Sequence, residues 1–405
     1  MGTLVDVLIL GGGPAGLKAA QVCAEKGLKT YVVEKKKEIG SPLQTSGATY
    51  IPEIRKLGIP ESFYHFVERI LFLSPNEETH FRNLKNGISV LDVRGMQQYL
   101  AEKAVSHGAK FFLGTRVMEP IVQDQEVGGA VVQTPQGNRE RIRSRVTIDA
   151  TGLASVTARK IFGFAGFRRY GVGLEHDVFA PHWPQGDFVL LVGSRIAPTG
   201  YGWIFPWGGN RVRVGVGVTY PEARGVDLRH CLNKLMEEDD RFAPYFRGAG
   251  CIELHRGFIP EEQFPKKPVA NGLLIIGDAA GQASALAGEG IRFAMEMGQL
   301  AARATIDALK KNGPRKEMLG KAHDEWEKRH GRNSRIAMAI NERMAAFSDP
   351  QWDKAVRYLT RLTDSQFLQF LKTDFTLSLF LRIIARNPDL VGKELVRQVL
   401  KEFKS

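Results

Sequence analysis

The sequence predicts an α/β fold that carries a second, antiparallel sheet and a helical C-terminal region. Three observations predict it. An apolar run at residues 7–10 leads directly into a glycine-rich turn and a helical segment, as at the first strand of a parallel sheet. Three strand-like runs follow one another between residues 188 and 218, and a Gly-Gly-Asn turn precedes the last of them. After residue 313, apolar and basic side chains recur at helical spacing.

The glycine-rich turn has the spacing of a dinucleotide-binding site. Residues 7–16 are VLILGGGPAG, so Gly11, Gly13 and Gly16 follow the apolar strand. The first glycine permits a tight turn, the second lets a pyrophosphate approach the backbone, and the third lets helix and strand pack closely. Pro14 suits the first helical turn, where its missing N–H costs no hydrogen bond. The pattern predicts a Rossmann-like domain with a phosphate group at the start of this helix.

Two further motifs indicate which dinucleotide binds. The run TYVVE ends its strand in Glu34, whose carboxylate suits ribose hydroxyls. Far downstream, Gly277 and Asp278 end a second buried strand, and a helix begins at about Gly290. An aspartate at this point suits the ribityl chain of a flavin, and the positive end of a helix suits the flavin ring, where reduction builds negative charge. Together these motifs favour FAD.

A third glycine-ended strand and an arginine-bearing helix extend the flavoprotein pattern. The strand VTIDATG ends in Gly152, and Arg94 lies in the run LDVRGMQQYLAEKA. With the motifs above, the chain resembles the FAD-dependent group of p-hydroxybenzoate hydroxylase-like flavoproteins, which includes aromatic hydroxylases, halogenases and geranylgeranyl reductases. Residues 198–206 are PTGYGWIFP and are followed by Gly215 and Gly217, which is similar to the signature of the geranylgeranyl reductase family. The resemblance covers about residues 3–310.

The signature strand also has a physical interpretation. Because side chains alternate along a strand, Tyr201, Trp203 and Phe205 share one face. Gly215 and Gly217 on the next strand leave a strip without side chains, wide enough for a flat ring or a lipid chain. An aromatic core under a sheet would show the same pattern. The resemblance favours an apolar tunnel for a prenyl chain.

The resemblance implies a set of cofactor residues. Val117, on the strand FFLGTRVMEPI, would contact the adenine through its backbone, and Thr45 and Ser46 would lie beside the flavin. Thr45 stands where many family members have a cysteine, so no thiol is expected near the ring. Glu289 stands where many have glycine, and its carboxylate either lies near the ring or stabilises a helix N-terminus. The residues expected to hold FAD are Gly11, Gly13, Pro14, Ala15, Gly16, Glu34, Lys35, Thr45, Ser46, Arg94, Val117, Gly152, Gly277, Asp278, Gly288, Gly290 and Ile291.

The activity that the resemblance implies is reduction of carbon–carbon double bonds in a prenyl lipid or quinone side chain. Reduced FAD would deliver a hydride to one alkene carbon while a proton reaches the other. Tyr201, Glu289, an ordered water and the flavin itself stay open as the proton donor. The substrate is expected to contact Pro198, Tyr201, Trp203, Phe205, Pro206, Gly215 and Gly217. The catalytic candidates are Tyr201, Trp203, Phe205 and Glu289.

Two alternative functions share the flavin motifs. A flavin-dependent monooxygenase or halogenase would carry the same glycine turn, and the halogenase strand Trp-x-Trp-x-Ile-Pro differs little from residues 201–206. A non-enzymatic flavin-binding sensor is the second alternative, although no signalling segment supports it. The electron donor stays open between NAD(P)H and reduced ferredoxin.

Composition and spacing suggest three regions. We expect an FAD-binding domain from residues 1–49, 92–160 and 266–312, a substrate domain from 50–91 and 161–265, and a helical region at 313–405. A hydrophobic content of 43% with 25% charged residues fits a globular enzyme. Without a membrane-spanning run or a signal sequence, we expect a cytoplasmic location. The three cysteines predict neither a metal site nor a disulfide framework.

The net charge of +12 raises the question of an anionic partner. Residues 315–405 carry 18 Lys and Arg against 12 Asp and Glu, which is half of the excess. Helices in this region would either dock loosely on the inner face of an anionic membrane or cap the body of the enzyme, and we favour the cap. No nucleic acid is expected, because the chain has no zinc finger, RNA-recognition signature or basic region.

Overall fold

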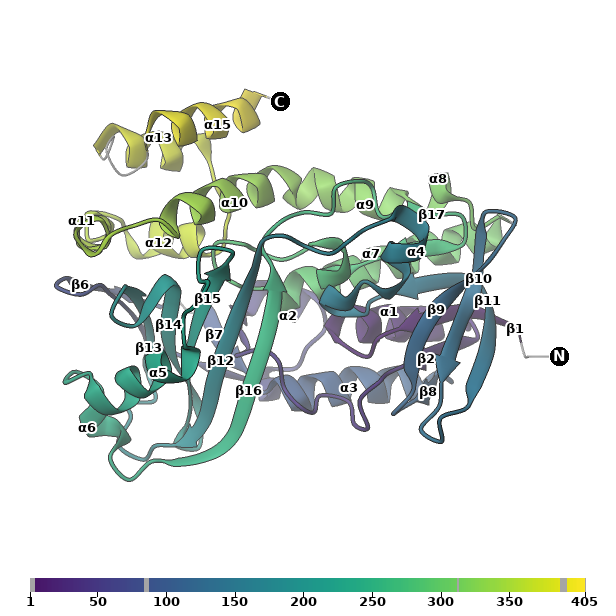
Figure 1. Ribbon diagram of the computed structural model, residues 1–405, viewed down its shortest axis with the longest axis horizontal. Coiled ribbons are helices and arrows are strands. Elements are labelled where there is room, and N and C mark those ends of the chain that lie inside the picture. Colours follow the sequence, from purple (N-terminus) through teal and green to yellow (C-terminus); the bar gives the residue numbers. More distant parts are fainter. Residues whose placement is uncertain (1–3, 84–86, 312, 387–391, 405) are drawn as a thin grey trace.

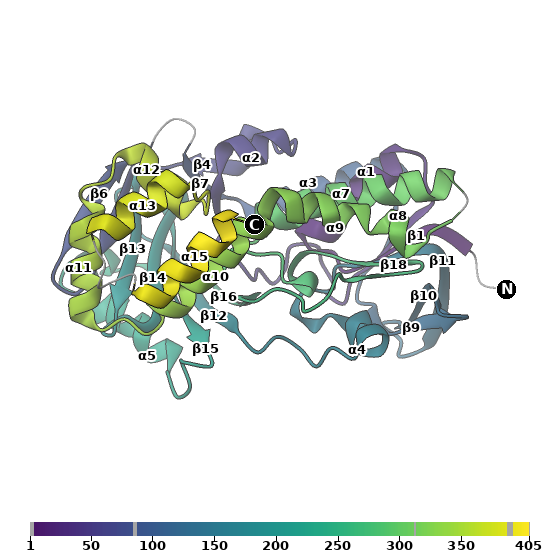
Figure 2. The same ribbon diagram turned by 90° about the horizontal axis from the view of Figure 1, so that it is seen from above.

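The computed structural model describes residues 4–83, 87–311, 313–386 and 392–404. Two large sheets lie side by side along the long axis of the molecule (Figure 1). Seen from above, the C-terminal helices lie across the seven-stranded sheet, and the N-terminal strand lies at the opposite end (Figure 2). No helix among the described residues is both long enough and apolar enough to cross a bilayer.

The glycine turn belongs to an eight-stranded sheet. Its order is β17-β18-β11-β1-β2-β8, with parallel pairing from β18 to β8, and β10 and β9 extend it in antiparallel fashion from β11. Its strands are β1 (Leu4–Leu10), β2 (Thr30–Val33), β8 (Lys110–Phe112), β9 (Arg116–Gln123), β10 (Glu126–Gln133), β11 (Arg139–Asp149), β17 (Val269–Ala270) and β18 (Leu273–Ile275). The helices around it are α1 (Pro14–Glu25), α3 (Val93–Ser106), α4 (Val156–Phe162) and α7 (Ile291–Lys310).

Helices α1 and α7 approach each other closely because small residues face each other between them. Ala15, Ala19 and Ala301 are buried in one cluster. A Cβ at Gly298 would lie 2.3 Å from the carbonyl oxygen of Ala15, so only glycine fits there. This packing brings the start of α7 next to the glycine turn, although the two motifs lie far apart in the sequence.

The signature strand lies in a seven-stranded sheet of order β16-β12-β15-β14-β13-β5-β6. The predicted antiparallel meander is confirmed, since β14 pairs with β13 and β15 and the chain turns at Gly209 and Asn210. One pair, β5 with β13, is parallel. The strands are β5 (Arg69–Leu73), β6 (Glu78–Arg82), β12 (Tyr170–Phe179), β13 (Asp187–Gly193), β14 (Ala197–Gly208), β15 (Arg211–Tyr220) and β16 (Gly250–Pro260).

Shorter elements connect the strands of the two large sheets. A three-stranded sheet of order β3-β7-β4 carries the chain between them. These elements are β3 (Ala48–Tyr50), α2 (Ile51–Lys56), η1 (Glu61–Phe63), β4 (Tyr64–Phe66), β7 (Ile88–Leu91), η2 (Gly152–Ala154), α5 (Leu228–Asn233), η3 (Lys234–Glu238), α6 (Ala243–Phe246) and η4 (Gly277–Ala280). The strands of each large sheet fall within the residue ranges that we expected for its domain, and the domain boundaries themselves stay a prediction.

One predicted strand is wrong. The run FFLGTRVMEPI forms two strands, because Gly114 turns the chain with a φ of +65° between β8 and β9. Val117 therefore lies near the start of the second strand, β9.

The C-terminal region forms a helical cap. Its helices are α8 (Lys316–Leu319), α9 (Lys321–Trp326), η5 (Glu327–Gly331), α10 (Arg332–Met344), α11 (Asp349–Leu359), α12 (Asp364–Leu371), α13 (Leu377–Arg386) and α15 (Lys393–Lys404). Trp352 of α11 and Phe367 of α12 are buried in one cluster with Phe81 of β6. Asp353 of α11 accepts hydrogen bonds from Ser74, at 2.6 Å, and from nearby backbone and amide groups. The cap interpretation therefore holds for α11 and α12.

The packing of Phe367 yields a first prediction. Its ring stacks on Phe81 at 3.8 Å between centroids and meets Phe72 edge-on at 6.0 Å. Phe367→Ala should lower the free energy of unfolding by about 3–5 kcal/mol, since a fully buried aromatic ring is lost. Phe179→Ala, at a ring that is 44% exposed, is the matched control and should change stability little. Equal losses in the two variants, measured by denaturant unfolding, would show that the cap is not anchored at Phe367.

Candidate active site

One cavity of about 700 Å³ connects the two large sheets. Its glycine arm includes the turn at Gly11 and extends to Glu34 and Lys35. Its apolar arm lies between the seven-stranded sheet and the cap, where Phe188 and Trp352 are among the lining residues. The two arms are continuous, so a group bound in one can touch a group bound in the other.

The glycine arm has the shape that a pyrophosphate requires. Gly11 adopts a φ of +108°, and a Cβ there would lie 2.2 Å from the carbonyl oxygen of Ala150. A Cβ at Gly16 would lie 2.0 Å from the carbonyl oxygen of Gly11, so this glycine serves the packing of α1 on β1. At Gly13 no heavy atom lies within 4 Å of the Cβ position. Open space therefore lies at the N-terminus of α1, where backbone N–H groups suit a phosphate.

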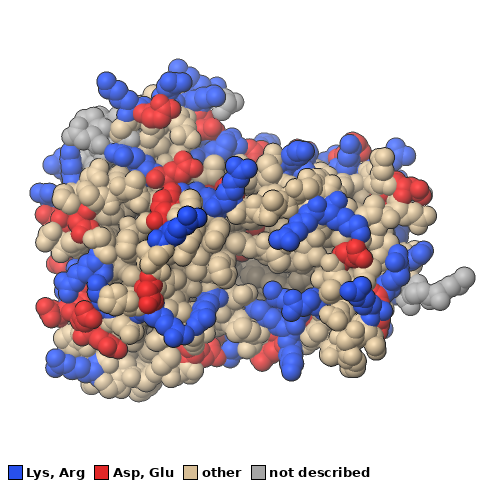
Figure 3. All heavy atoms as spheres, viewed as in Figure 1, with Lys and Arg blue, Asp and Glu red and all other residues tan. Residues whose placement is uncertain are grey.

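Glu34 is held in place beside this turn. Its buried carboxylate accepts hydrogen bonds from the backbone N–H of Gly12, at 2.6 Å, and of Lys36, at 2.8 Å. Lys35 and Arg116 line the same arm and add positive charge. The face shown in Figure 3 is hollowed near its centre, and lysine and arginine side chains gather around the hollow. The donors and charges of this arm fit the adenosine and pyrophosphate parts of FAD.

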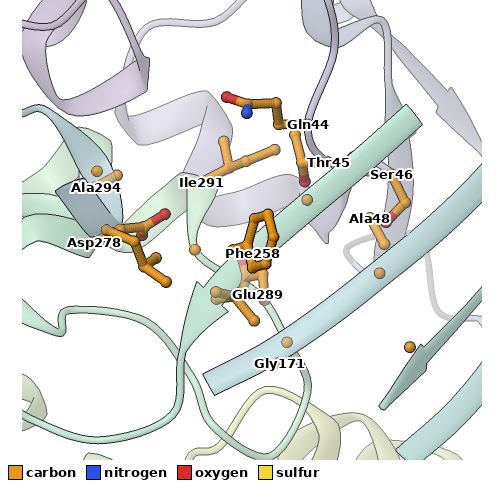
Figure 4. A pocket seen from close by; sticks show the side chains of 18 of the residues that line it. Gln44, Thr45, Ser46, Ala48, Gly171, Phe258, Asp278, Glu289, Ile291 and Ala294 are labelled. Carbon is orange, nitrogen blue, oxygen red and sulfur yellow. The ribbon is translucent and has the colours of Figure 1, made fainter. Parts of the chain in front are cut away.

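Asp278 provides the clearest sign of a missing polar partner. Its half-buried carboxyl has no hydrogen-bond partner in the described part of the chain, and burial raises its pKa to about 6. Asp278 lies on one wall of the cavity together with Ile291, the first residue of α7. Thr45 and Ser46 face them from the other wall (Figure 4). Ribityl hydroxyls would satisfy the carboxyl, so the residues present fit a flavin.

Most of the predicted site residues share this cavity. Those that line it are Gly11, Gly13, Pro14, Ala15, Glu34, Lys35, Thr45, Ser46, Val117, Gly152, Tyr201, Trp203, Phe205, Gly217, Asp278, Gly288, Glu289, Gly290 and Ile291. Those that do not, in the described part of the chain, are Gly16, Arg94, Pro198, Pro206, Gly215 and Gly277. The Arg94 guanidinium donates to Glu253 at 2.8 Å, so its contact with the cofactor stays a prediction.

Glu289 forms an ion pair that the sequence did not predict. Its carboxylate accepts from Arg292 Nε at 2.6 Å and from Thr49 Oγ1 at 2.9 Å. It lines the cavity and precedes α7. It forms an ion pair with Arg292 in the first turn of that helix and does not cap the helix backbone. The Arg292 guanidinium does not release a proton, so this ion pair cannot supply Glu289 with a proton to pass on. The arrangement therefore argues against Glu289 as the proton donor.

The aromatic side chains of β14 lie on one face, as predicted. Successive ring centroids are 5.6 Å apart for Tyr201 and Trp203 and 6.1 Å apart for Trp203 and Phe205. The expected empty strip is wrong, however. A Cβ at Gly215 would lie 2.3 Å from the Trp203 indole, so this ring itself covers the glycines. Glycine at 215 makes room for Trp203 and leaves no space there for a ligand.

Tyr201 joins β14 to the loop before α7. Its hydroxyl donates to the carbonyl oxygen of Ala287 at 2.8 Å, and burial raises its pKa. Gly288 beside it has a φ of +60°, and a Cβ there would lie 2.8 Å from the tyrosine oxygen. The close approach of this loop therefore brings the aromatic strand to the edge of the expected flavin position.

Two groups of lining residues carry no signal in the sequence. Glu175 and His255 face the cavity from β12 and β16, and they carry no motif that would mark them. The cap contributes Trp352, Phe370 and Leu371, which are apolar residues at helical spacing within the segment that we expected to pack on the body. Spacing alone gave no sign that these residues close a ligand cavity.

Fold and site together define an FAD-dependent oxidoreductase. Residues 6–164 match the family model for FAD-dependent oxidoreductases, and residues 185–258 match the geranylgeranyl reductase catalytic domain. The chain belongs to the geranylgeranyl reductase family, as the sequence predicted. It is 30% identical over 384 residues to the digeranylgeranylglycerophospholipid reductase of Haloferax volcanii, covering 89% of this chain and 90% of that protein.

Other comparisons agree with this family. A digeranylgeranylglycerophospholipid reductase of Methanopyrus kandleri is 26% identical over 400 residues, covering 95% of this chain and 97% of that protein. The solved structure of a geranylgeranyl bacteriochlorophyll reductase-like protein from Thermoplasma acidophilum is also similar, with a TM-score of 0.86 at 25% identity. The match covers 98% of this chain and 100% of that chain. The solved structure of a flavin-dependent brominase has a TM-score of 0.71 at 19% identity, and the match covers 96% of this chain and 100% of that chain. At this identity, the likeness shows a shared fold alone. The reductase prediction is confirmed, and the halogenase and sensor alternatives are not supported.

The carboxyl of Asp278 yields a second prediction. Its ionised form accepts hydrogen bonds from ribityl hydroxyls, so FAD binding lowers its pKa and affinity rises with pH until the free protein is ionised, near pH 6. The Kd for FAD at pH 5 should exceed that at pH 8 by about tenfold. Asp278→Asn should remove this slope, which titration of the FAD-free protein by fluorescence would measure. A slope that survives in Asp278→Asn would assign it to another group.

Proposed function

We propose that the protein saturates double bonds in a prenyl lipid of the digeranylgeranylglycerophospholipid class. The observation that carries this proposal is the apolar arm, which continues directly from the expected flavin position. Its lining residues include Phe72, Ile88, Phe188, Leu190, Val192, Phe205, Met344, Trp352, Phe370 and Leu371. An apolar chain gains about 0.8 kcal/mol for each methylene group that leaves water, so a long prenyl chain has ample driving force to enter.

The arm suits an unactivated alkene. Such a double bond has no carbonyl that the protein can polarise, so catalysis depends on position and on exclusion of water. When bound and reduced, FAD supplies the hydride. Phe188 stacks on Phe205 at 3.9 Å, which gives the arm a rigid wall, and the cap residues Trp352 and Leu371 also line it. These walls would hold a chain at the junction of the two arms.

The activity itself gives a third prediction. Anaerobic enzyme with chemically reduced FAD should convert a geranylgeranyl lipid into products heavier by multiples of two hydrogens, which mass spectrometry would detect. Chemical reduction avoids the physiological donor, for which NAD(P)H and reduced ferredoxin stay predictions. Unchanged lipid would contradict the proposal, and so would products that gain oxygen or halogen when air and halide are admitted in a parallel reaction.

A substitution in the apolar arm tests where the prenyl chain of the substrate binds. Val192→Phe adds a ring within the apolar arm and should slow the reduction on the order of a hundredfold, because misplacement of the alkene is costly. FAD content should not change. Val122→Phe, at a side chain that is 43% exposed on β9, is the matched control. Full activity in Val192→Phe would place the chain elsewhere.

We propose further that the enzyme meets its lipid at an anionic membrane surface through α13 and α15. Leu377 and Leu381 lie one turn apart on α13 and are 42% and 46% exposed. On α15, Lys393, Arg397 and Lys401 are exposed at four-residue spacing, so they share one face. The view in Figure 3 has basic side chains at the top of the molecule, over these helices. Exposed leucines beside a basic face suit attachment to anionic lipid.

Charge removal on α15 tests the membrane proposal. Each basic side chain near an anionic surface contributes about 1 kcal/mol, so Lys393→Gln, Arg397→Gln and Lys401→Gln together should weaken vesicle binding by roughly a hundredfold. The matched control replaces the three exposed arginines of β11, Arg139, Arg141 and Arg143, with Gln. Sedimentation with phosphatidylglycerol vesicles at rising salt would measure binding. If both triple variants lose vesicle binding equally, the net charge of the protein alone attracts it to the vesicles, and α15 is not the binding surface.

A further inference from the structure

A chain of polar side chains runs from the aromatic strand to the edge of the seven-stranded sheet. Trp203 Nε1 donates to Glu175 at 2.6 Å, and the other oxygen of Glu175 lies 2.7 Å from His255 Nδ1. His255 Nε2 lies 3.0 Å from Glu253, which also accepts from Arg94 at 2.8 Å. The chain therefore crosses β14, β12 and β16 and ends at α3 without a gap.

The two ends of this chain have different surroundings. Glu175 and His255 are directly opposite each other on β12 and β16, are each about 3% exposed at the side chain, and line the cavity. Glu253 lies two residues from His255 along β16, and its side chain is 29% exposed. One end of this hydrogen-bonded series therefore faces the cavity, and the other end reaches solvent.

The two hydrogen bonds of His255 favour the positively charged form of its ring. Both of its ring nitrogens face carboxylate oxygens, and an ionised carboxylate only accepts hydrogen bonds, so both nitrogens must donate. Burial lowers the pKa of His255, but its hydrogen bonds with Glu175 and Glu253 outweigh burial and raise it, against a smaller opposing effect of Arg213 on β15. A raised pKa means that the imidazolium persists to higher pH than in a free histidine. The hydrogen bonds to two carboxylates therefore favour the charged form of His255 beside the cavity.

We propose that His255 supplies, through Glu175, the proton that each double-bond saturation consumes, and that Glu253 restores it from solvent. This inference rests on the proposed prenyl reduction. The hydride and its two electrons form one new C–H bond, while the electron pair of the alkene takes the proton and forms the other. Glu175 passes the proton to the alkene and takes another from His255, so the imidazolium becomes a neutral imidazole. A proton taken from the buffered solvent at Glu253 returns His255 to the charged form. The alkene gains two hydrogens, and the reduced cofactor is oxidised by two electrons.

Two of the earlier candidates, Glu289 and Tyr201, lack these properties. The Glu289 carboxylate is paired with Arg292, and the Tyr201 hydroxyl donates to a backbone carbonyl while burial raises its pKa. Their partners are a guanidinium and a backbone carbonyl, and neither partner can replace a lost proton. The Glu175–His255–Glu253 chain combines a stored proton, contact with the cavity and a route for its replacement.

The first test examines the charge without any turnover. In FAD-free protein labelled with ¹⁵N-histidine, NMR should show one imidazolium that persists above the ordinary histidine range and disappears in His255→Gln. Glu253→Gln should lower its pKa, since one carboxylate is lost. His176→Gln, on the adjacent position of β12 and its opposite face, is the matched control and should leave this signal unchanged. A neutral His255 at pH 7 would overturn the proposal.

The second test measures proton supply in a single turnover. Mixing reduced enzyme with a geranylgeranyl lipid should oxidise the flavin at a rate that falls as His255 deprotonates. His255→Gln should lower this rate on the order of a hundredfold and remove its pH dependence, and Glu253→Gln should move the profile to lower pH. Oxidation by ferricyanide should be unaffected in all variants, which shows that the flavin site is intact.

The outcomes separate this inference from the proposed function. If the wild-type enzyme does not reduce the lipid, the proposed function fails, and the NMR result still decides the charge of His255. If the wild type is active and His255→Gln keeps its rate and pH profile, the proton route is wrong. If His255→Gln does not fold, the Glu253→Gln variant, at a partly exposed position, serves as the test. An unchanged pH profile of its flavin oxidation rate contradicts the proposal.

Discussion

A buried ion pair between Glu289 and Arg292 holds together the parts of the molecule that form the site. Glu289 also accepts from Thr49 of β3, and Arg292 donates to the carbonyl oxygen of Lys372, at the end of α12, at 2.7 Å. Removal of one partner of such a pair costs about 3–5 kcal/mol, because the other charge stays buried alone. The pair therefore fixes the start of α7, the small sheet and the cap relative to one another.

This arrangement determines where the two arms of the cavity meet. Tyr201 binds the loop that carries Glu289, so the aromatic strand and the start of α7 cannot move independently. Trp203 lies flat over Gly215 and donates to Glu175, so its ring is fixed by packing and by a hydrogen bond. A reaction that depends on the position of an unactivated alkene needs such rigid walls. The fold supplies them at the boundary between a polar arm and an apolar arm.

The sequence predicted the local parts of this site better than the distant ones. The glycine turn and Glu34 follow from steric rules that act within one βαβ unit, so their spacing alone identifies them. Glu175 and His255 are 80 residues apart, and their contact depends on the register of β12 and β16, which no local pattern specifies. The cap residues line the cavity because of how α11 and α12 dock on the sheet. The Glu289–Arg292 pair has i,i+3 spacing, and this signal was present in the sequence.

The most direct test of the account is a crystal structure of the enzyme with FAD and a geranylgeranyl lipid. We expect the flavin between Asp278 and Thr45, and one prenyl chain in the apolar arm between Phe188 and the cap residue Trp352. A double bond of that chain should lie at the junction of the two arms. A chain bound outside the cavity, with the apolar arm closed or filled by protein side chains, would contradict the central claim that this arm positions the substrate.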